Sequence, residues 1–334
     1  MIERKLASIQ EIKEINPIPN ADAIEVATIL GWKVVIKKAD NFKVGDKVVY
    51  FEVDSKLPAK PEYEFLANYG YRVKTQKFRG QVSQGLVLPM SILPDGVYNV
   101  GDDVSKLLGV EKYEIPLPLS VAGDIMGTFP GFIEKTDETR IQILGDILPK
   151  YNGTKFYVTE KVDGTSITLF NKDGDIGVCT RNNRMKETPN SAPWNVLKSL
   201  GAVDKIKQFN NIAIQGELIG WNIQGNKYKL KTNEFRFYMF NAFDINNYRP
   251  LPLNDMLQIA KALGLNTVPM IDSNYTLNFD VDTLVEMSKG QSKINNQTRR
   301  EGLVFKSVEY IEDPKLGRLS FKVINPDFLI KYGE

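Results

Sequence analysis

The sequence contains no histidine and only one cysteine, Cys179, among its 334 residues. The missing histidine excludes serine–histidine and cysteine–histidine nucleophiles and any zinc site with histidine ligands. One thiol cannot form a cysteine cluster or an internal disulfide, which indicates a reducing, intracellular compartment, either cytoplasmic or nuclear. Any catalysis must therefore use lysine, carboxylates or a bound metal ion.

Long apolar runs are also missing, and the first ten residues, MIERKLASIQ, have no apolar core typical of a secretory signal. We therefore expect no contact with a membrane. The 43 basic and 41 acidic side chains give a formal charge of +2, and 42% of the residues are hydrophobic. These values indicate a globular chain of about two domains. A nearly neutral total does not exclude a nucleic-acid partner, because such binding depends on a local basic patch.

Short β-type segments separated by turns occupy the N-terminal part of the chain. They are WKVVIKK (32–38), VVYFEV (48–53), YRVKTQKF (71–78) and GLVLP (85–89). This spacing predicts an all-β barrel of the five-stranded OB type. Prolines and glycines without a clear period over 114–131 indicate a linker, so we place the boundary near residue 125. We expect an OB-like nucleic-acid-binding domain over 1–125 and a second domain over 126–334.

The second part combines strands with a few helices. Its expected strands are KFYVTEK (155–161), SITLF (166–170), IGVCTR (176–181), IAIQGELIG (212–220), FRFYMFNAF (235–243), LVFKSV (303–308) and LSFKVI (319–324). Helical periodicity occurs over 194–206, 257–263 and 284–287. Because helices do not separate most of the strands, we predict an α+β domain built on antiparallel sheets.

The segment Lys161-Val162-Asp163-Gly164 leaves the strand KFYVTEK in a KxDG pattern, directly after Glu160. Taken alone, this pattern is most simply a charged turn. Downstream, the Asp-Gly pair at 173–174 predicts a two-residue hairpin loop. Paired positions of that hairpin sum to 347, which places Arg181 near Lys161, across from Ser166.

Alternation along two strands places a charged side chain opposite an apolar face. In IAIQGELIG this side chain is Glu217, and in LSFKVI it is Lys322. A carboxylate in so apolar a strand requires a partner or a metal ion. Glu301 and Lys306 can reach one site only if their strand begins after Gly302. Each strand could instead be a half-solvated edge with ordinary surface charges.

In order, these segments resemble the motifs of the covalent nucleotidyltransferases, the family of ATP-dependent ligases and mRNA capping enzymes. The matching stretches are KVDG (161–164), GELIG (216–220), FRFYMFNAFDI (235–245), EGLVFK (301–306) and Lys322. Their amino-acid sequences most resemble the corresponding motifs of RNA ligases. The OB-like module followed by FPGFIEKTDETRIQ (129–142) is similar to the Naegleria-type RNA ligases. One departure is the motif around Lys322, which lacks the second lysine of the usual Lys-x-Lys pattern.

The resemblance implies an ATP-dependent RNA ligase that joins 3′-OH and 5′-phosphate ends, with nicked duplex RNA as the expected partner. Lys161 would form a covalent lysyl-AMP, and AMP would then pass to the RNA 5′-phosphate. The implied catalytic residues are Lys161, Lys322, Lys306 and Asp163. The implied ATP-binding residues are Glu160, Lys161, Arg181, Glu217, Phe237, Lys306 and Lys322, with the Phe237 ring stacked on adenine. We expect the chain to act as a monomer.

A hydrated Mg²⁺ or Mn²⁺ ion is expected at Glu217 and Glu301, with Asp163 as a third candidate. Asp163 could instead bind a ribose hydroxyl or orient the RNA 3′-hydroxyl. The Lys161 nucleophile must be neutral, although the reference pKa of lysine is about 10.4. We expect Lys306, Lys322 and the metal ion to lower the pKa of Lys161.

Basic residues interleaved with aromatic ones in the first domain suggest contacts to RNA phosphates and bases. These residues are Arg72, Lys74, Lys77 and Arg79, and Arg140 in the segment 129–142 is a further candidate. A solvated barrel edge is the alternative for the first four. The segment 129–142 could be the start of a helix capped by Thr136.

Two other functions fit parts of the same pattern. A noncatalytic RNA-binding protein could use the second domain only to sense nucleotide, although the complete set of lysines and carboxylates argues against this. A DNA ligase or capping-type enzyme would share the motifs. Lys322 lies twelve residues before the last printed residue, so we expect no C-terminal OB domain of the kind those enzymes carry.

Overall fold

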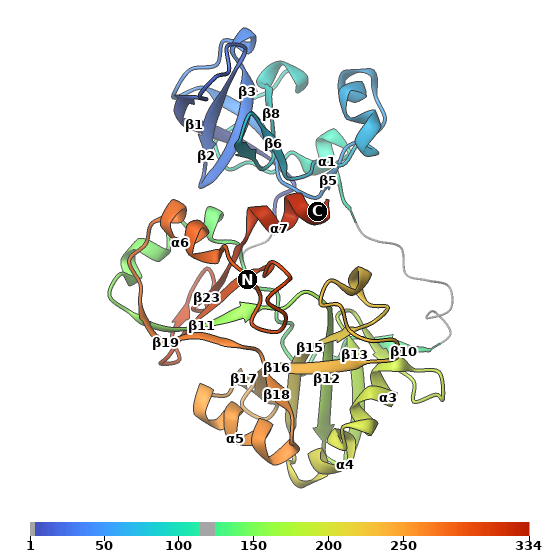
Figure 1. Cartoon of the computed structure of the whole chain (residues 1–334). Helices are drawn as coiled ribbons and strands as arrows, with labels where there is room; N and C mark the ends of the chain where they lie inside the picture. Colours follow the sequence, from blue (N-terminus) through green and yellow to red (C-terminus); the bar gives the residue numbers. More distant parts are fainter. Residues whose placement is uncertain (1–3, 114–123, 334) are drawn as a thin grey trace.

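The computed structural model describes residues 4–113 and 124–333. Figure 1 shows a smaller β-rich domain, blue to teal, beside a larger domain that contains the rest of the chain, with helix α7 (Pro326–Tyr332) near their boundary. Residues 114–123 of the expected linker lie outside the described residues. Ile125–Thr128 forms strand β10 of the larger domain, so the linker prediction is wrong there. The boundary near residue 125 stays a prediction.

The smaller domain is built on a curled antiparallel sheet with strand order β3-β2-β1-β4-β8. Its strands are β1 (Ala7–Pro17), β2 (Ile24–Ile29), β3 (Trp32–Lys37), β4 (Lys47–Phe51) and β8 (Leu86–Pro89). The first half of β1 pairs with β4 and the second half with β2, with a register irregularity between Ile12 and Glu14. The amide of Gln84 donates to the carbonyl of Lys33 at 2.8 Å, which draws β3 toward the β8 side. The OB-type prediction is confirmed.

The expected strand over 71–78 is interrupted. Only Gln76–Phe78 forms a strand, β6, which pairs with β7 (Gln81–Ser83). A 3₁₀ segment, Pro61–Tyr69, precedes it, and Tyr71 has a left-handed φ of 59°. The remaining elements here are β5 (Ser55–Lys56), α1 (Ser105–Leu108) and β9 (Glu111–Lys112). The prediction of one strand over 71–78 is therefore wrong.

The larger domain contains two main sheets. The first has the strand order β10-β14-β13-β12-β15-β16-β17, with β18 paired in parallel to β16. Its strands after β10 are β12 (Thr165–Lys172), β13 (Asp175–Thr180), β14 (Asn183–Met185), β15 (Ile212–Gly220), β16 (Phe235–Asp244), β17 (Arg249–Pro250) and β18 (Asn266–Thr267). All its other pairings are antiparallel, which confirms the predicted class.

The second sheet has the order β19-β11-β20-β23 and is antiparallel. Its strands are β11 (Lys155–Lys161), β19 (Met270–Thr276), β20 (Gly302–Ser307) and β23 (Ser320–Ile324). A small hairpin of β21 (Glu312–Asp313) and β22 (Gly317–Arg318) connects β20 to β23.

The β12–β13 hairpin has the predicted register. Lys172 pairs with Asp175 and Ile167 with Thr180, so paired positions sum to 347. Asp173 and Gly174 form the loop with positive φ values of 51° and 87°, as a two-residue turn of this type requires.

The predicted helix over 194–206 is divided into α3 (Ala192–Ser199) and α4 (Ala202–Lys205), because Gly201 adopts a left-handed φ of 67° between them. The other two helical predictions correspond to α5 (Leu253–Leu263) and α6 (Val281–Ser288). Across the two described ranges, no helix is both long and apolar enough to cross a membrane.

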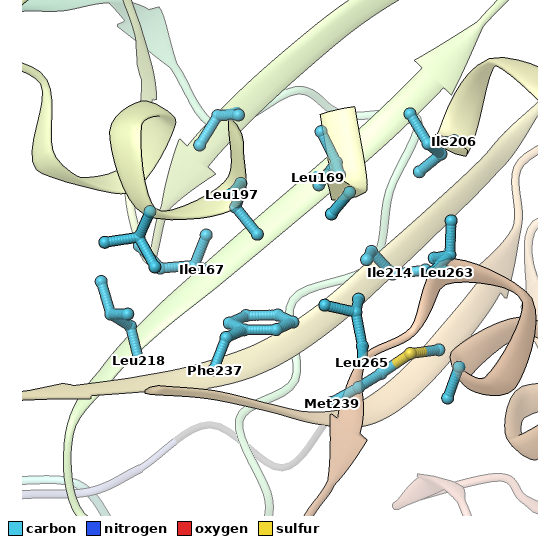
Figure 2. Packing of buried hydrophobic residues seen from close by; sticks show 14 of the residues in the cluster. Ile167, Leu169, Leu197, Ile206, Ile214, Leu218, Phe237, Met239, Leu263 and Leu265 are labelled. Carbon is cyan, nitrogen blue, oxygen red and sulfur yellow. The ribbon is translucent and has the colours of Figure 1, made fainter. Parts of the chain in front are cut away.

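Two apolar cores lie on the outer faces of the two main sheets. Figure 2 shows the first, where Ile167, Ile214 and Leu218 pack around Phe237 beneath the helices. In the second, the rings of Phe305 and Phe321 stack at 4.8 Å. Because the apolar side chains occupy these faces, the polar side chains on the opposite faces are left to line a cavity between the sheets.

Candidate active site

A cavity of about 350 Å³ lies between the two main sheets. Both sheets contribute charged side chains to its wall. Of the residues predicted from the sequence, those that line it are Glu160, Lys161, Asp163, Arg181, Glu217, Lys306 and Lys322. The structure therefore brings together residues that are as much as 162 positions apart in the sequence, from Glu160 to Lys322.

Lys161 ends β11 and pairs with Gly302, the first residue of β20. Its Nζ donates to both carboxylate oxygens of Glu301 at 2.7 Å. A Cβ on Gly302 would lie 2.3 Å from the carbonyl oxygen of Val323, so only glycine permits β23 to approach this closely. β20 therefore starts at Gly302, directly after Glu301. Lys306, farther along β20, faces the cavity as predicted.

The pKa of Lys161 shifts in the opposite direction from the prediction. Burial lowers this pKa, but the carboxylates of Glu301, Glu217 and Asp163 outweigh burial and raise it above the ordinary lysine value. The reason is proximity, since Glu301 is in direct contact with the ammonium group. In this state Lys161 is a charged amine held by acids, so it needs a compensating positive charge before it can act as a nucleophile.

Glu217 projects from β15 toward Lys161. Burial raises the pKa of Glu217 to about 8, and the charges of Glu301 and Asp163 add to this effect against the opposing effect of Lys161. The KxDG turn packs closely on the same strand, because a Cβ on Gly164 would lie 2.4 Å from the carbonyl oxygen of Leu218. Burial therefore favours the protonated form of Glu217 unless a cation compensates its charge.

Lys306 and Lys322 line the same cavity from the second sheet. Burial, with Arg318 nearby, lowers the pKa of Lys306 to about 7. Burial, with Arg140 and Lys161 nearby, lowers the pKa of Lys322 to about 7. An anionic ligand such as a phosphate would favour the protonated form of both lysines and would gain hydrogen-bond donors.

Asp163 is held by residues outside the motif. Its carboxylate contacts Lys227 Nζ at 2.7 Å, and its backbone amide donates to the hydroxyl of Tyr228 at 2.9 Å. Neither Lys227 nor Tyr228 was predicted, because nothing in the local pattern distinguishes them from other loop residues.

The carboxylates fit a hydrated divalent ion better than a directly liganded one. Within 4–113 and 124–333, no group of three or more acidic, cysteine or histidine side chains is arranged to hold a metal ion. Mg²⁺ and Mn²⁺ accept one or two carboxylates together with waters and phosphate oxygens. Glu217 and the adjacent Glu301 match that donor set, with Lys161 in contact with Glu301 and Lys227 in contact with Asp163.

The predicted adenine-stacking residue is wrong. Phe237 is 2% exposed and packs in the core of the first sheet, away from the cavity. Gln215 pairs with Asn241 and Gly216 with Met239, so Phe240 is an extra residue that interrupts the alternation of β16. Phe240 lies three residues after Phe237, on the opposite face of β16, where it is half-buried and lines the cavity.

Glu160 lines the cavity although it is 1% exposed. One of its carboxylate oxygens accepts from the amide of Lys293 at 2.8 Å. The other, Oε1, has no hydrogen-bond partner in the described part of the chain. Burial raises the pKa of Glu160, opposed by bonds from Ser292 and Lys293. A buried acceptor without a partner at a cavity wall is suited to a ligand donor group.

The segment 129–142 is not a helix start. Residues 134–139 have no regular secondary structure, and Lys135, Thr136 and Asp137 line the cavity. Arg181 forms an ion pair with Asp137 at 2.8 Å, and the amide of Lys322 donates to the carbonyl of Thr139 at 2.8 Å. The segment therefore spans from one sheet to the other, and this contact with Lys322 could not be read from helix-capping patterns.

Arg72 and Arg140 do not lie on an open RNA-binding surface, contrary to prediction. Each side chain is 15% exposed. Arg72 pairs with Asp54 at 2.6 Å, and Arg140 lies over the ring of Trp32, 5.5 Å from its centroid. Asp54 engages the guanidinium group of Arg72, whereas Nη1 of Arg140 is buried and has no hydrogen-bond partner among the described residues.

Lys74 donates to the carbonyl of Gly333 at 3.1 Å, next to helix α7. Lys77 and Arg79 are exposed on either side of Phe78, at the turn between β6 and β7. Arg79 and Gly80 form that turn with positive φ values of 49° and 89°. Of the basic residues predicted in the first domain, these two remain open to a ligand.

The chain matches two family models. One is described as an OB-fold domain and matches residues 6–90, and the other is described as RNA ligase and matches residues 154–324. No curated protein matches the chain.

Solved structures of Naegleria gruberi RNA ligase are similar over nearly the whole length. A variant with ATP and Mn shares 39% identity at a TM-score of 0.88, covering 97% of this chain and 98% of that one. Another variant with ATP and Mn shares 39% identity at a TM-score of 0.89, covering 99% and 100%. The enzyme with PPi shares 39% identity at 0.88, covering 98% of each chain.

Proposed function

Because this chain belongs to the RNA ligase family, we propose that it seals RNA ends in an ATP-dependent reaction through a covalent lysyl-AMP at Lys161. Its substrate is a nicked RNA duplex with a 3′-OH and a 5′-phosphate, and it acts as a monomer in a reducing, intracellular compartment, cytoplasmic or nuclear. The observation that carries this proposal is that Lys161, Lys306 and Lys322 line one cavity together with Glu217. Glu301 contacts Lys161 Nζ there.

Lys161 Nζ attacks the α-phosphorus of ATP. A nitrogen–phosphorus bond forms, and the bond from that phosphorus to the pyrophosphate oxygen breaks. The attack requires loss of an ammonium proton, and the 2.7 Å hydrogen bonds to Glu301 give that proton an acceptor. A divalent metal ion held by Glu217 and Glu301 would supply the positive charge that lowers the pKa of the amine and stabilises the phosphate oxygens.

The remaining groups of the cavity bind the nucleotide. Lys306 and Lys322 donate to phosphate oxygens, and Arg181 contacts the ribose or a phosphate. The free oxygen of Glu160 accepts from the amino group of adenine. The ring of Phe240 stacks on the base in the position first expected of Phe237.

The two later steps use the same site. AMP passes from Lys161 to the RNA 5′-phosphate, and the RNA 3′-hydroxyl then attacks that phosphate and displaces AMP. Asp163 orients the 3′-hydroxyl. Lys77 and Arg79, with Phe78 between them, contact RNA from the first domain by phosphate pairing and base stacking. Solved structures of Naegleria gruberi RNA ligase hold ATP with Mn in one case and PPi in another, which supports ATP and PPi as the ligands of the first step.

The direct test is covalent labelling. Wild-type protein incubated with Mg²⁺ and α-labelled ATP should retain label through a denaturing gel, and Lys161→Ala should reduce it to background because the nucleophile is missing. Lys155→Ala is the matched control, since Lys155 is an exposed lysine on the same strand. Absence of label from the wild type with any divalent cation would contradict the proposal and favour a noncatalytic RNA-binding protein.

Substrate choice separates the related activities. Labelling from GTP alone would indicate capping chemistry. Nicked duplexes whose 3′-OH strand ends in ribonucleotides should be sealed faster than all-DNA nicks, and equal rates would make the RNA assignment wrong.

A further inference from the structure

The KxDG turn rests on a loop that belongs to no recognised motif. This loop, residues 221–234, connects β15 to β16. Its Tyr228 accepts a hydrogen bond from the amide of Asp163 at 2.9 Å, and its Lys227 contacts the Asp163 carboxylate at 2.7 Å. Both the backbone and the side chain of Asp163 are therefore fixed by one loop.

Lys227 is itself enclosed. Its side chain is 9% exposed, and that of Asp163 is 11% exposed. The Lys227 Nζ lies 5.1 Å from the ring centroid of Phe328 and 5.2 Å from that of Tyr332, both on α7. Aromatic faces attract a cation, and an ion pair shielded from water is weakened little by salt. The pair is thus a defined contact and not a fluctuating surface bridge.

The loop is anchored independently of Asp163. The hydroxyl of Thr298 donates to the carbonyl of Lys227 at 2.6 Å, and Asn295 donates to the carbonyl of Tyr228 at 2.8 Å. Thr298 is 1% exposed and Tyr228 is 4% exposed. Because its backbone is held from behind, Lys227 presents its ammonium group to Asp163 from a fixed position.

From these contacts we infer that Lys227 is a positioning residue of the ligation reaction, which acts only through Asp163. It orients the Asp163 carboxylate at the cavity wall and thereby fixes the turn that carries Lys161 two residues earlier. The inference rests on the proposed ligase function. The loop 221–234 thereby has a role in the site, although it belongs to none of the sequence motifs.

A double-mutant cycle tests it. Lys227→Met keeps an unbranched apolar side chain of similar length but removes the charge. Two rates are measured for the wild type, Lys227→Met, Asp163→Asn and the double variant: formation of covalent AMP, and sealing of a nick whose 5′-phosphate is already adenylylated. Lys227→Met should slow the same step as Asp163→Asn, by about tenfold or more, and the double variant should be no slower than Asp163→Asn alone.

Two further variants make the result specific. Lys227→Arg should recover part of the lost rate, because it restores a cation beside the Asp163 carboxylate and the two rings. Lys229→Met is the matched control, an exposed lysine in the same loop that contacts Gln297, and it should leave both rates unchanged. Thermal melting of each variant confirms that it is folded.

Wild-type rates for Lys227→Met in both steps would overturn the inference, and so would effects that multiply in the double variant. Either result, obtained with a wild type that forms covalent AMP, would leave the ligase proposal intact. Failure of the wild type to label would instead contradict the ligase proposal itself.

Discussion

Phe237 and Phe240 lie three positions apart on β16 and therefore point to opposite faces of the strand. Phe237 packs in the apolar core, where a smaller side chain leaves an unfilled volume. Phe240 lines the cavity, and its ring lies 5.4 Å from the ammonium group of Lys306. A substitution at each position should therefore affect a different property.

The same change at both positions separates the two roles. Phe240→Leu should raise the ATP concentration for half-maximal labelling about tenfold, the equivalent of roughly 1.4 kcal/mol of lost stacking, with little change in Tm. Phe237→Leu should lower the stability by about 1–2 kcal/mol and leave the ATP dependence nearly unchanged. Labelling titrations and thermal melts measure both effects. The reverse pattern would show that Phe237 contacts the base.

Side-chain alternation was sufficient to find Glu217 and Lys322, because β15 and β23 have one continuous apolar face each. The choice of Phe237 over Phe240 came from the family resemblance and not from alternation, which places residues three positions apart on opposite faces of a strand. Lys227 was missed for a different reason. Its importance comes from Asp163 and α7, which are remote in the sequence, and nothing in its own neighbourhood indicates burial.

Among the elements, the β21–β22 hairpin is held by one buried acid. Asp313 is 1% exposed and accepts from Lys150 Nζ at 2.6 Å, from the Tyr151 hydroxyl at 2.8 Å and from two backbone amides. Burial alone would raise the pKa of Asp313, but these donors outweigh burial and lower it. The carboxylate therefore favours the folded state only while it is ionised.

The consequence is a defined dependence of stability on pH. Because the folded pKa of Asp313 lies below its unfolded value of about 3.9, its contribution is complete above that pH and is lost as the pH falls toward the folded pKa. Asp313→Asn should cost on the order of 2 kcal/mol at pH 7, the usual value for charge-assisted hydrogen bonds left unmade. The difference from the wild type should shrink progressively below about pH 4.

Urea unfolding across that pH range measures this difference. Asp204→Asn is the control, because Asp204 also pairs with a lysine, Lys207, but is exposed on a helix, so its loss should matter much less. A deficit for Asp313→Asn that stays constant from pH 7 to acid would contradict the assignment.

The elements themselves were largely predictable where local signals and packing agree. The β12–β13 hairpin followed from its Asp-Gly loop, and α5 from its apolar stripe. For the segment 129–142, the alternative of a helix start fitted the local capping residues, whereas in the fold its backbone contacts β23 and the side chain of Gln215. Contacts of this kind arise only after both sheets have formed.

At the scale of the whole molecule, the two domains are in contact behind the site. The amide of Gly31, in the turn between β2 and β3, donates to the carbonyl of Gln142 at 2.8 Å. Beside it, the Trp32 ring lies against Arg140, whose backbone bridges to Lys322 of the cavity. The first domain therefore supports the segment that borders the nucleotide cavity.

Gly31 is the tightest point of this contact. A Cβ there would lie 2.9 Å from both the Cα and the carbonyl oxygen of Gln142, and backbone atoms cannot move aside as a flexible side chain can. Gly31→Ala should thus separate the domains locally and disturb Arg140 and Lys322, with a cost of about 1–3 kcal/mol typical of overpacking.

We expect faster hydrogen exchange across 139–144 in Gly31→Ala and slower covalent labelling with ATP, while exchange in the distant α5 stays unchanged. Gly145→Ala is the matched control, since a Cβ at Gly145 would meet nothing within 4 Å. If Gly31→Ala exchanged and labelled like the control, the contact would be a passive one, and the site would depend on the larger domain alone. Slower labelling in Gly31→Ala alone would instead mean that docking of the OB-type domain sets the geometry around Lys322, although none of the described residues of that domain lines the cavity.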